Sequence, residues 1–150
     1  MRVLALFFAV TLAACGDFAP DRNLRRHASA EEIVGTWRLL PSSLNVLKKE
    51  AQYSPVEISR PHDIVFRSDG SCHFRSADEF SPERAEYFDT EASWKLVHDP
   101  PFSDGKRNEV QIIVGVRGIT LNLAEVNHRL HLWQFWGDPD GWQFLEYEKT

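Results

Sequence analysis

Beyond residue 34, apolar residues recur at every second position in several stretches of this chain, and that spacing limits what the chain can fold into. A period of two gives a β-strand one apolar face and one polar face. It is clearest in residues 108–116, where Val110, Ile112, Val114 and Val116 share a face, and in residues 118–126, where Ile119, Leu121 and Leu123 do. The pattern is typical of eight strands, near residues 35–40, 62–67, 71–76, 91–97, 108–116, 118–126, 129–136 and 142–148. We therefore expect an all-β domain in which one antiparallel eight-stranded sheet closes into a barrel.

Short helices are expected at two places beside the first strand. Before it, Ser29 can cap a single turn at residues 30–34, with acidic residues following the cap. After it, Leu44, Leu47 and Ala51 lie at helical spacing between Pro41 and Pro61. This second helix would be either a lid over one end of the barrel or a plug in that end, and the sequence does not distinguish the two.

The hairpin around Asp69-Gly70 has two possible registers. A two-residue turn would pair apolar with polar side chains on each face of the sheet. A three-residue loop at 68–70, with Gly70 in the left-handed conformation, pairs Phe66 with Cys72 and Ile64 with Phe74. The second register is favoured, and it predicts that Cys72 is an inert thiol packed among apolar side chains.

The first 14 residues have the parts of an export signal. Arg2 gives a basic start, residues 3–12 are apolar, and small residues precede Cys15. The apolar run is shorter than the roughly 20 residues that a membrane span needs. Leu12-Ala13-Ala14-Cys15 resembles the bacterial lipobox, in which the cysteine takes up a diacylglyceryl group and the leader is then removed. The resemblance implies a signal peptide at 1–14, a lipidated N-terminus and flexible tether at 15–29, and a folded domain at 30–150.

Lipid on Cys15 would leave Cys72 as the only thiol, so the mature domain would have no internal disulfide. The alternative is an ordinary secreted protein that is cut after Ala14 and carries a bridge between the two cysteines. In lipoproteins, aspartate directly after the lipidated cysteine favours retention in the inner membrane. Gly16 occupies that position here, which implies the outer membrane, with the domain facing the periplasm.

The chain is acidic, with a formal charge of −5, and removing a leader whose only charge is Arg2 makes it more so. Nucleic-acid binding needs a basic footprint, so a nucleic-acid partner is not expected. For the same reason we expect attachment to the membrane through the lipid anchor and not through the protein surface.

A second resemblance concerns the folded domain. Ile33-Val34-Gly35-Thr36-Trp37 is similar to the Gly-x-Trp opening of the lipocalins, and the later Trp94 and Phe144 strands fit small lipocalin-like domains in order. The Thr-Asp-Tyr segment of many lipocalins is missing. The resemblance implies that Trp37 plugs the closed end of the barrel under an arginine, either Arg129 or Arg117. It also implies a small hydrophobic ligand inside, with walls that include Trp37, Ile112, Val114 and Leu121.

Aromatic residues gather near the C-terminus, on both sides of the turn Asp138-Pro139-Asp140-Gly141. Period two places Trp133 and Phe135 opposite Leu132 and Trp136, so the hairpin is apolar on both faces. One face should line the core, and the other is a possible interaction surface formed by Trp133, Phe135, Trp136 and Trp142. This is the basis of an alternative function, in which the barrel is filled by its own side chains and docks another envelope protein.

No catalytic arrangement is predicted, and we expect neither an enzyme nor a cofactor. His128 and His131 would lie on opposite faces of a strand, which prevents joint metal binding. The acidic residues at 78–91 match no calcium loop and are interpreted as a solvated connector.

Overall fold

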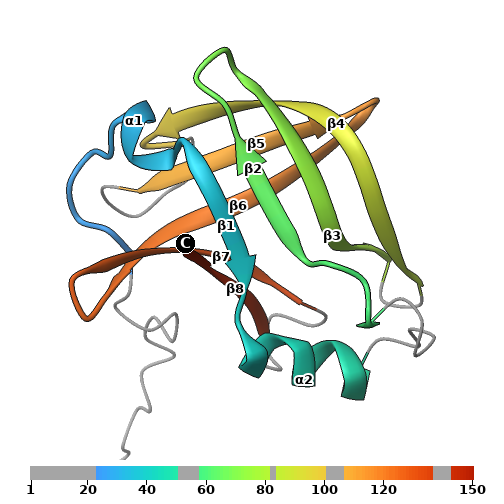
Figure 1. Cartoon of the computed structure of the whole chain (residues 1–150). Coiled ribbons are helices and arrows are strands. Elements are labelled where there is room, and N and C mark those ends of the chain that lie inside the picture. Colours follow the sequence, from blue (N-terminus) through green and yellow to red (C-terminus); the bar gives the residue numbers. More distant parts are fainter. Residues whose placement is uncertain (1–22, 51–57, 82–83, 101–106, 137–142) are drawn as a thin grey trace, which may run out of the picture.

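Eight antiparallel strands form a closed barrel in the computed structural model of the chain (Figure 1). The structure describes residues 23–50, 58–81, 84–100, 107–136 and 143–150. The strands are β1 Gly35–Leu39, β2 Asp63–Phe66, β3 Ser71–Ser81, β4 Arg84–His98, β5 Asn108–Val114, β6 Arg117–Val126, β7 Arg129–Phe135 and β8 Phe144–Lys149. Each pairs with the next, and β8 pairs with β1 to close the barrel. The predicted fold class is confirmed.

Two helices flank β1, so they lie at opposite ends of the barrel (Figure 1). The first, α1 Ala30–Ile33, is capped by Ser29, whose hydroxyl accepts the Glu32 N–H while the Glu32 carboxylate accepts the Ser29 N–H. The second, α2 Pro41–Glu50, is the predicted helix between the first two strands. We refer to the two ends of the barrel as the α1 end and the α2 end.

The α1 end is closed by Trp37. Its side chain is fully buried, and its indole N–H donates to the carbonyl of Ile33 at 2.7 Å. The cation over its ring is Lys149, with Nζ at 5.9 Å from the ring centroid, and Lys149 also donates to the carbonyl of Glu32. The prediction of an arginine there is wrong, because Arg129 pairs with Glu148 and Arg117 pairs with Glu86.

Residues 23–28 form a strap that belongs to the barrel, although the sequence predicts a flexible tether up to residue 29. Asn23 bridges to Ala124, and the Leu24 N–H donates to the carbonyl of Leu123, so the strap pairs with β6 beyond the end of β5. Leu24 is buried in the core. The folded domain therefore includes Asn23, and the sequence pattern misses this because a strap of mixed composition shows no period.

The side chain of Asn108 holds the strap in place. Its carboxamide oxygen accepts the Ala28 N–H at 2.8 Å, and its nitrogen donates to the carbonyls of Leu24 and Arg26. Asn108 is itself buried, so these bonds satisfy polar groups that water does not reach.

The β2–β3 hairpin has the predicted register. Phe66 is opposite Cys72 and Ile64 is opposite Phe74. Gly70 has φ of +82°, which is the left-handed conformation that the three-residue loop requires. Both the loop and its register are confirmed.

The β3–β4 hairpin is longer than predicted. Its ladder continues to Ser81 opposite Arg84, so residues 78–81 and 84–91 lie in strands. The interpretation of this acidic stretch as a connector is therefore wrong. Its alternation is hard to recognise because polar and charged residues occur on both faces.

Candidate functional site

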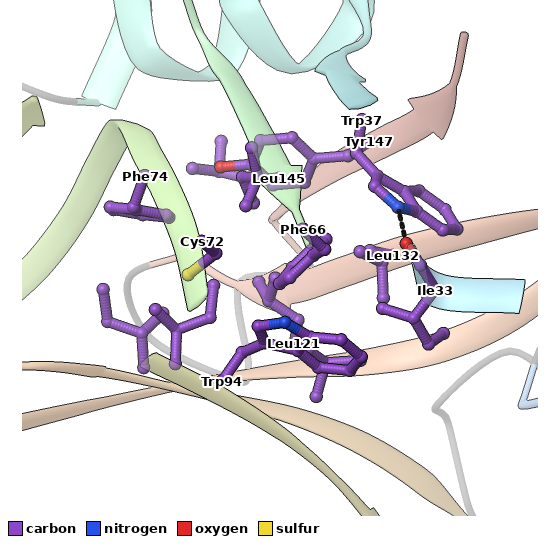
Figure 2. Close-up of a cluster of buried hydrophobic side chains, with 14 of the residues drawn as sticks. Ile33, Trp37, Phe66, Cys72, Phe74, Trp94, Leu121, Leu132, Leu145 and Tyr147 are labelled. Atoms are coloured by element: carbon purple, nitrogen blue, oxygen red, sulfur yellow. Dashed lines mark hydrogen bonds between the residues drawn. The ribbon is translucent and has the colours of Figure 1, made fainter. Parts of the chain in front are cut away.

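The barrel interior is the first candidate site, because the lipocalin resemblance implies a ligand there. Figure 2 shows the buried cluster, with Trp37 and Leu132 toward α1 and Phe66, Cys72 and Leu121 together in the middle. Trp37, Ile112 and Leu121, three of the predicted ligand walls, have an exposed fraction of 0%. A side chain with no exposed surface has no room beside it even for a water molecule. The fourth, Val114, is partly buried and packs against the cluster.

Polar side chains cross the interior farther toward the α2 end. The hydroxyls of Tyr147 on β8 and Ser76 on β3 are hydrogen-bonded at 2.7 Å, and His62 Nδ1 lies 3.3 Å from the Ser76 hydroxyl. Burial of Tyr147 raises the pKa of its phenol above the ordinary range, so the group stays neutral. On β7, the Gln134 amide donates to the carbonyl of Ala77 at 3.5 Å. These contacts tie β3 to β7 and β8 across the barrel.

Helix α2 closes part of the same end. Leu47 is fully buried in the core, and the Ser43 hydroxyl accepts the backbone N–H of Glu146 on β8. A helix that contributes a fully buried leucine to the core fits the plug interpretation better than the lid.

Cys72 has the predicted environment. The side chain is fully buried, and burial raises the pKa of its thiol to about 12. A thiol that stays protonated is a poor nucleophile, so Cys72 acts as a packing residue.

The aromatic residues of the β7–β8 hairpin divide between two faces. Leu132 and Trp136 are buried in the core. Trp133, Phe135 and Phe144 form an outer cluster, with ring centroids 5.0 Å apart for Trp133 and Phe135 and 6.2 Å apart for Trp133 and Phe144. Trp142 lies outside the described residues. Of the predicted interaction surface, the structure therefore brings Trp133 and Phe135 together, adds Phe144, and places Trp136 inside.

The outer aromatic cluster of Trp133, Phe135 and Phe144 is partly open to solvent. Phe135 is 41% exposed, and its ring contacts a second aromatic side chain, that of Trp133. Trp133 is almost covered, and its indole N–H has no hydrogen-bond partner among the described residues.

Four of the six histidines, His27, His73, His128 and His131, pair with carboxylates, and His27 also stacks on His98. His131 lies 2.8 Å from Glu146, and His128 lies 3.7 Å from Glu125. Within the described residues, no three histidine, cysteine or acidic side chains are placed to hold a metal ion. Cys15, the predicted lipidation site, lies outside the described residues.

Comparisons with protein families, with curated proteins and with solved structures found no match to this chain. Among the described residues, no helix is both long and apolar enough to cross a membrane.

Proposed function

We propose that this protein is a lipid-anchored lipoprotein of the bacterial envelope, with a filled barrel that docks another envelope protein through the outer aromatic cluster. The observation that carries the docking proposal is a contrast in exposure. The inner walls Trp37, Ile112 and Leu121 are wholly buried, whereas Phe135 on the outside is 41% exposed. Interfaces are enriched in such aromatic residues, and filled space leaves little room for a ligand.

The anchor is proposed on the lipobox resemblance at Cys15, which also implies the outer membrane. Its test is the intact mass of the exported protein. The expected mass is that of a chain starting at Cys15 with a diacylglyceryl group and one further acyl chain, and Cys15→Ala should remove that addition. An unmodified Cys15, or an uncut leader, would contradict the anchor without touching the docking proposal.

The docking surface can be tested by photo-crosslinking in intact cells. A photoreactive phenylalanine analogue at position 135 should give one discrete adduct with another envelope protein. Ile113 is a matched control, because it is 43% exposed and also lies on a strand of the barrel. Adducts that are absent at 135, or the same at both positions, would reject the aromatic cluster as a docking surface.

A small hydrophobic ligand is the second candidate, and one observation at the α2 end favours it. The inward-facing Phe88 and Val114 are only partly buried there, and Gln134, itself 6% exposed, makes a single long hydrogen bond among the described residues. These side chains could meet a ligand at the mouth of the barrel, with Val114 as its wall. Native mass spectrometry of protein taken from the membrane should then show a retained small molecule that Val114→Trp displaces. A bare polypeptide mass for the unaltered protein would remove this candidate.

A further inference from the structure

Strand β4 is longer than β5, and its first part extends beyond the residues that pair with β5. Pairing between β4 and β5 covers only Ser93–His98 on β4, beginning opposite Ile113. From Glu86 to Ala92, β4 pairs with β3 on one side. Among the described residues, no strand pairs with its other side. Figure 1 shows β4 curving past the tip of the β5–β6 hairpin toward the α2 end. We call residues 86–92 of this side the β4 edge.

The register identifies the backbone groups that face the β4 edge. Trp94 donates its N–H to the carbonyl of Gly70, on the β3 side. Backbone groups alternate in direction along a strand, and the β3–β4 ladder has no irregularity between Ser71 and Glu79. The N–H groups of Tyr87, Asp89 and Glu91 therefore point to the β4 edge. An unpaired row of this kind is a template for an added strand.

Charge indicates which strand would fit. The side chains of Glu86, Asp89 and Glu91 flank the β4 edge and are 56%, 59% and 60% exposed. Each of these carboxylates has a cationic partner on one face of the sheet. Arg117 on β6 pairs with Glu86, His73 on β3 pairs with Asp89, and Arg67, directly after β2, pairs with Glu91. The surrounding stretch from Asp78 to Glu91 has six acidic residues and one basic residue, Arg84. A second copy of this acidic edge would be repelled.

We infer that the β4 edge takes up an extended basic segment of a partner protein as an additional strand. Backbone hydrogen bonds to Tyr87, Asp89 and Glu91 would supply affinity, and the carboxylates would select lysine or arginine at alternate positions. This inference goes beyond the proposed docking function, because it concerns a different surface from the aromatic cluster.

The test uses a synthetic peptide that alternates lysine and valine over about seven residues, with a second peptide of the same sequence N-methylated on one edge. The two have equal charge but differ in their ability to extend a sheet. Fluorescence anisotropy with the whole mature domain should show binding of the first peptide and at least about tenfold weaker binding of the second. Equal binding of the two would mean attraction by charge alone and would overturn the inference, as would no binding of either.

A pair of variants tests the same edge from the protein side. Asp89→Pro removes a backbone N–H that points away from β3, where proline is tolerated, and Asp89→Asn removes the same charge but keeps the N–H. The proline variant should bind the peptide about fivefold more weakly than the asparagine variant, with equal thermal stability. Equal affinities in two folded variants would overturn the inference. Phe135→Ala should leave peptide binding unchanged, so failure of the aromatic docking surface would be seen separately.

Discussion

At the scale of single residues, burial and hydrogen bonding set the chemistry of groups that look reactive in the sequence. Cys72 is fully buried beside Phe66 and Phe74, and Glu32 accepts hydrogen bonds from Arg26 and from the Ser29 backbone. Burial keeps the Cys72 thiol protonated, and the hydrogen bonds keep the Glu32 carboxylate ionised. Each therefore has a measurable consequence.

The Cys72 thiol should react slowly in the folded protein. Burial raises its pKa to about 12 and blocks access, so a disulfide reagent near pH 8 should modify it more than about a hundredfold slower than in urea. A chain truncated to start at Asn23 has Cys72 as its only cysteine and is suitable for this titration. Equal rates in the folded and unfolded protein would contradict the buried position.

Stability should decrease in acid partly through Glu32. Hydrogen bonds from Arg26 and from the Ser29 N–H lower the pKa of Glu32 from its ordinary 4.5 to about 2. Because the folded state favours the ionised form, the stabilisation is complete above pH 4.5 and is lost as the pH falls toward 2. Glu32→Gln keeps the capping pattern, so the urea midpoint of this variant should depend less on pH between 4.5 and 2 than that of the wild-type protein. The same pH dependence in the wild-type protein and in Glu32→Gln would contradict this role of Glu32.

At the scale of elements, strand positions and the β2–β3 register could be predicted because period two determines which residues share a face. The position of the strap could not be predicted, because it depends on hydrogen bonds from Asn108 to backbone groups some 80 residues earlier in the chain. The distal β3–β4 hairpin was missed because its alternation is polar. Period two separates Trp133 from Trp136, but only the structure shows that Trp136 is the one that faces the core. Lipidation of Cys15 and a role for Trp142 stay predictions, as does the ligand contact of Trp37, Ile112, Val114 and Leu121.

The β2–β3 loop should depend on its glycine. Gly70 has φ of +82°, whereas the position of a Cβ there is sterically open, with Trp94 O at 3.8 Å. Gly70→Ala should therefore lower the free energy of unfolding by about 1–2 kcal/mol through backbone strain alone. Gly118→Ala is the control, because nothing lies within 4 Å of its Cβ and its φ is not positive. It should change stability by no more than about 0.5 kcal/mol.

At the scale of the whole molecule, the strap, α2 and the barrel share one core. Leu24 from the strap and Leu47 from α2 belong to the same buried cluster as Trp37 and Tyr147. Parts that share a core are expected to unfold together. We therefore expect the strap, α2 and the barrel strands to unfold as one cooperative unit.

Shortening either leucine should destabilise the entire domain. Leu24→Ala and Leu47→Ala should each lower the free energy of unfolding by about 2–4 kcal/mol, because each leaves a cavity in the core. Tryptophan fluorescence and far-ultraviolet circular dichroism should still give one coincident transition in urea. Val116→Ala, at a fully exposed site, should stay within about 0.5 kcal/mol. Separate transitions for the two probes would show that the strap or α2 unfolds independently.

The docked strap also determines how the domain would stand on a bilayer. Asn23 is fixed near the α1 end by its bridge to Ala124, and only seven residues, which make eight Cα–Cα steps, separate it from Cys15. Whatever path they take, they reach at most about 28 Å. An acylated Cys15 would thus keep the Trp37 end close to the headgroups, and Asp89 would point into the periplasm, where soluble proteins can approach it.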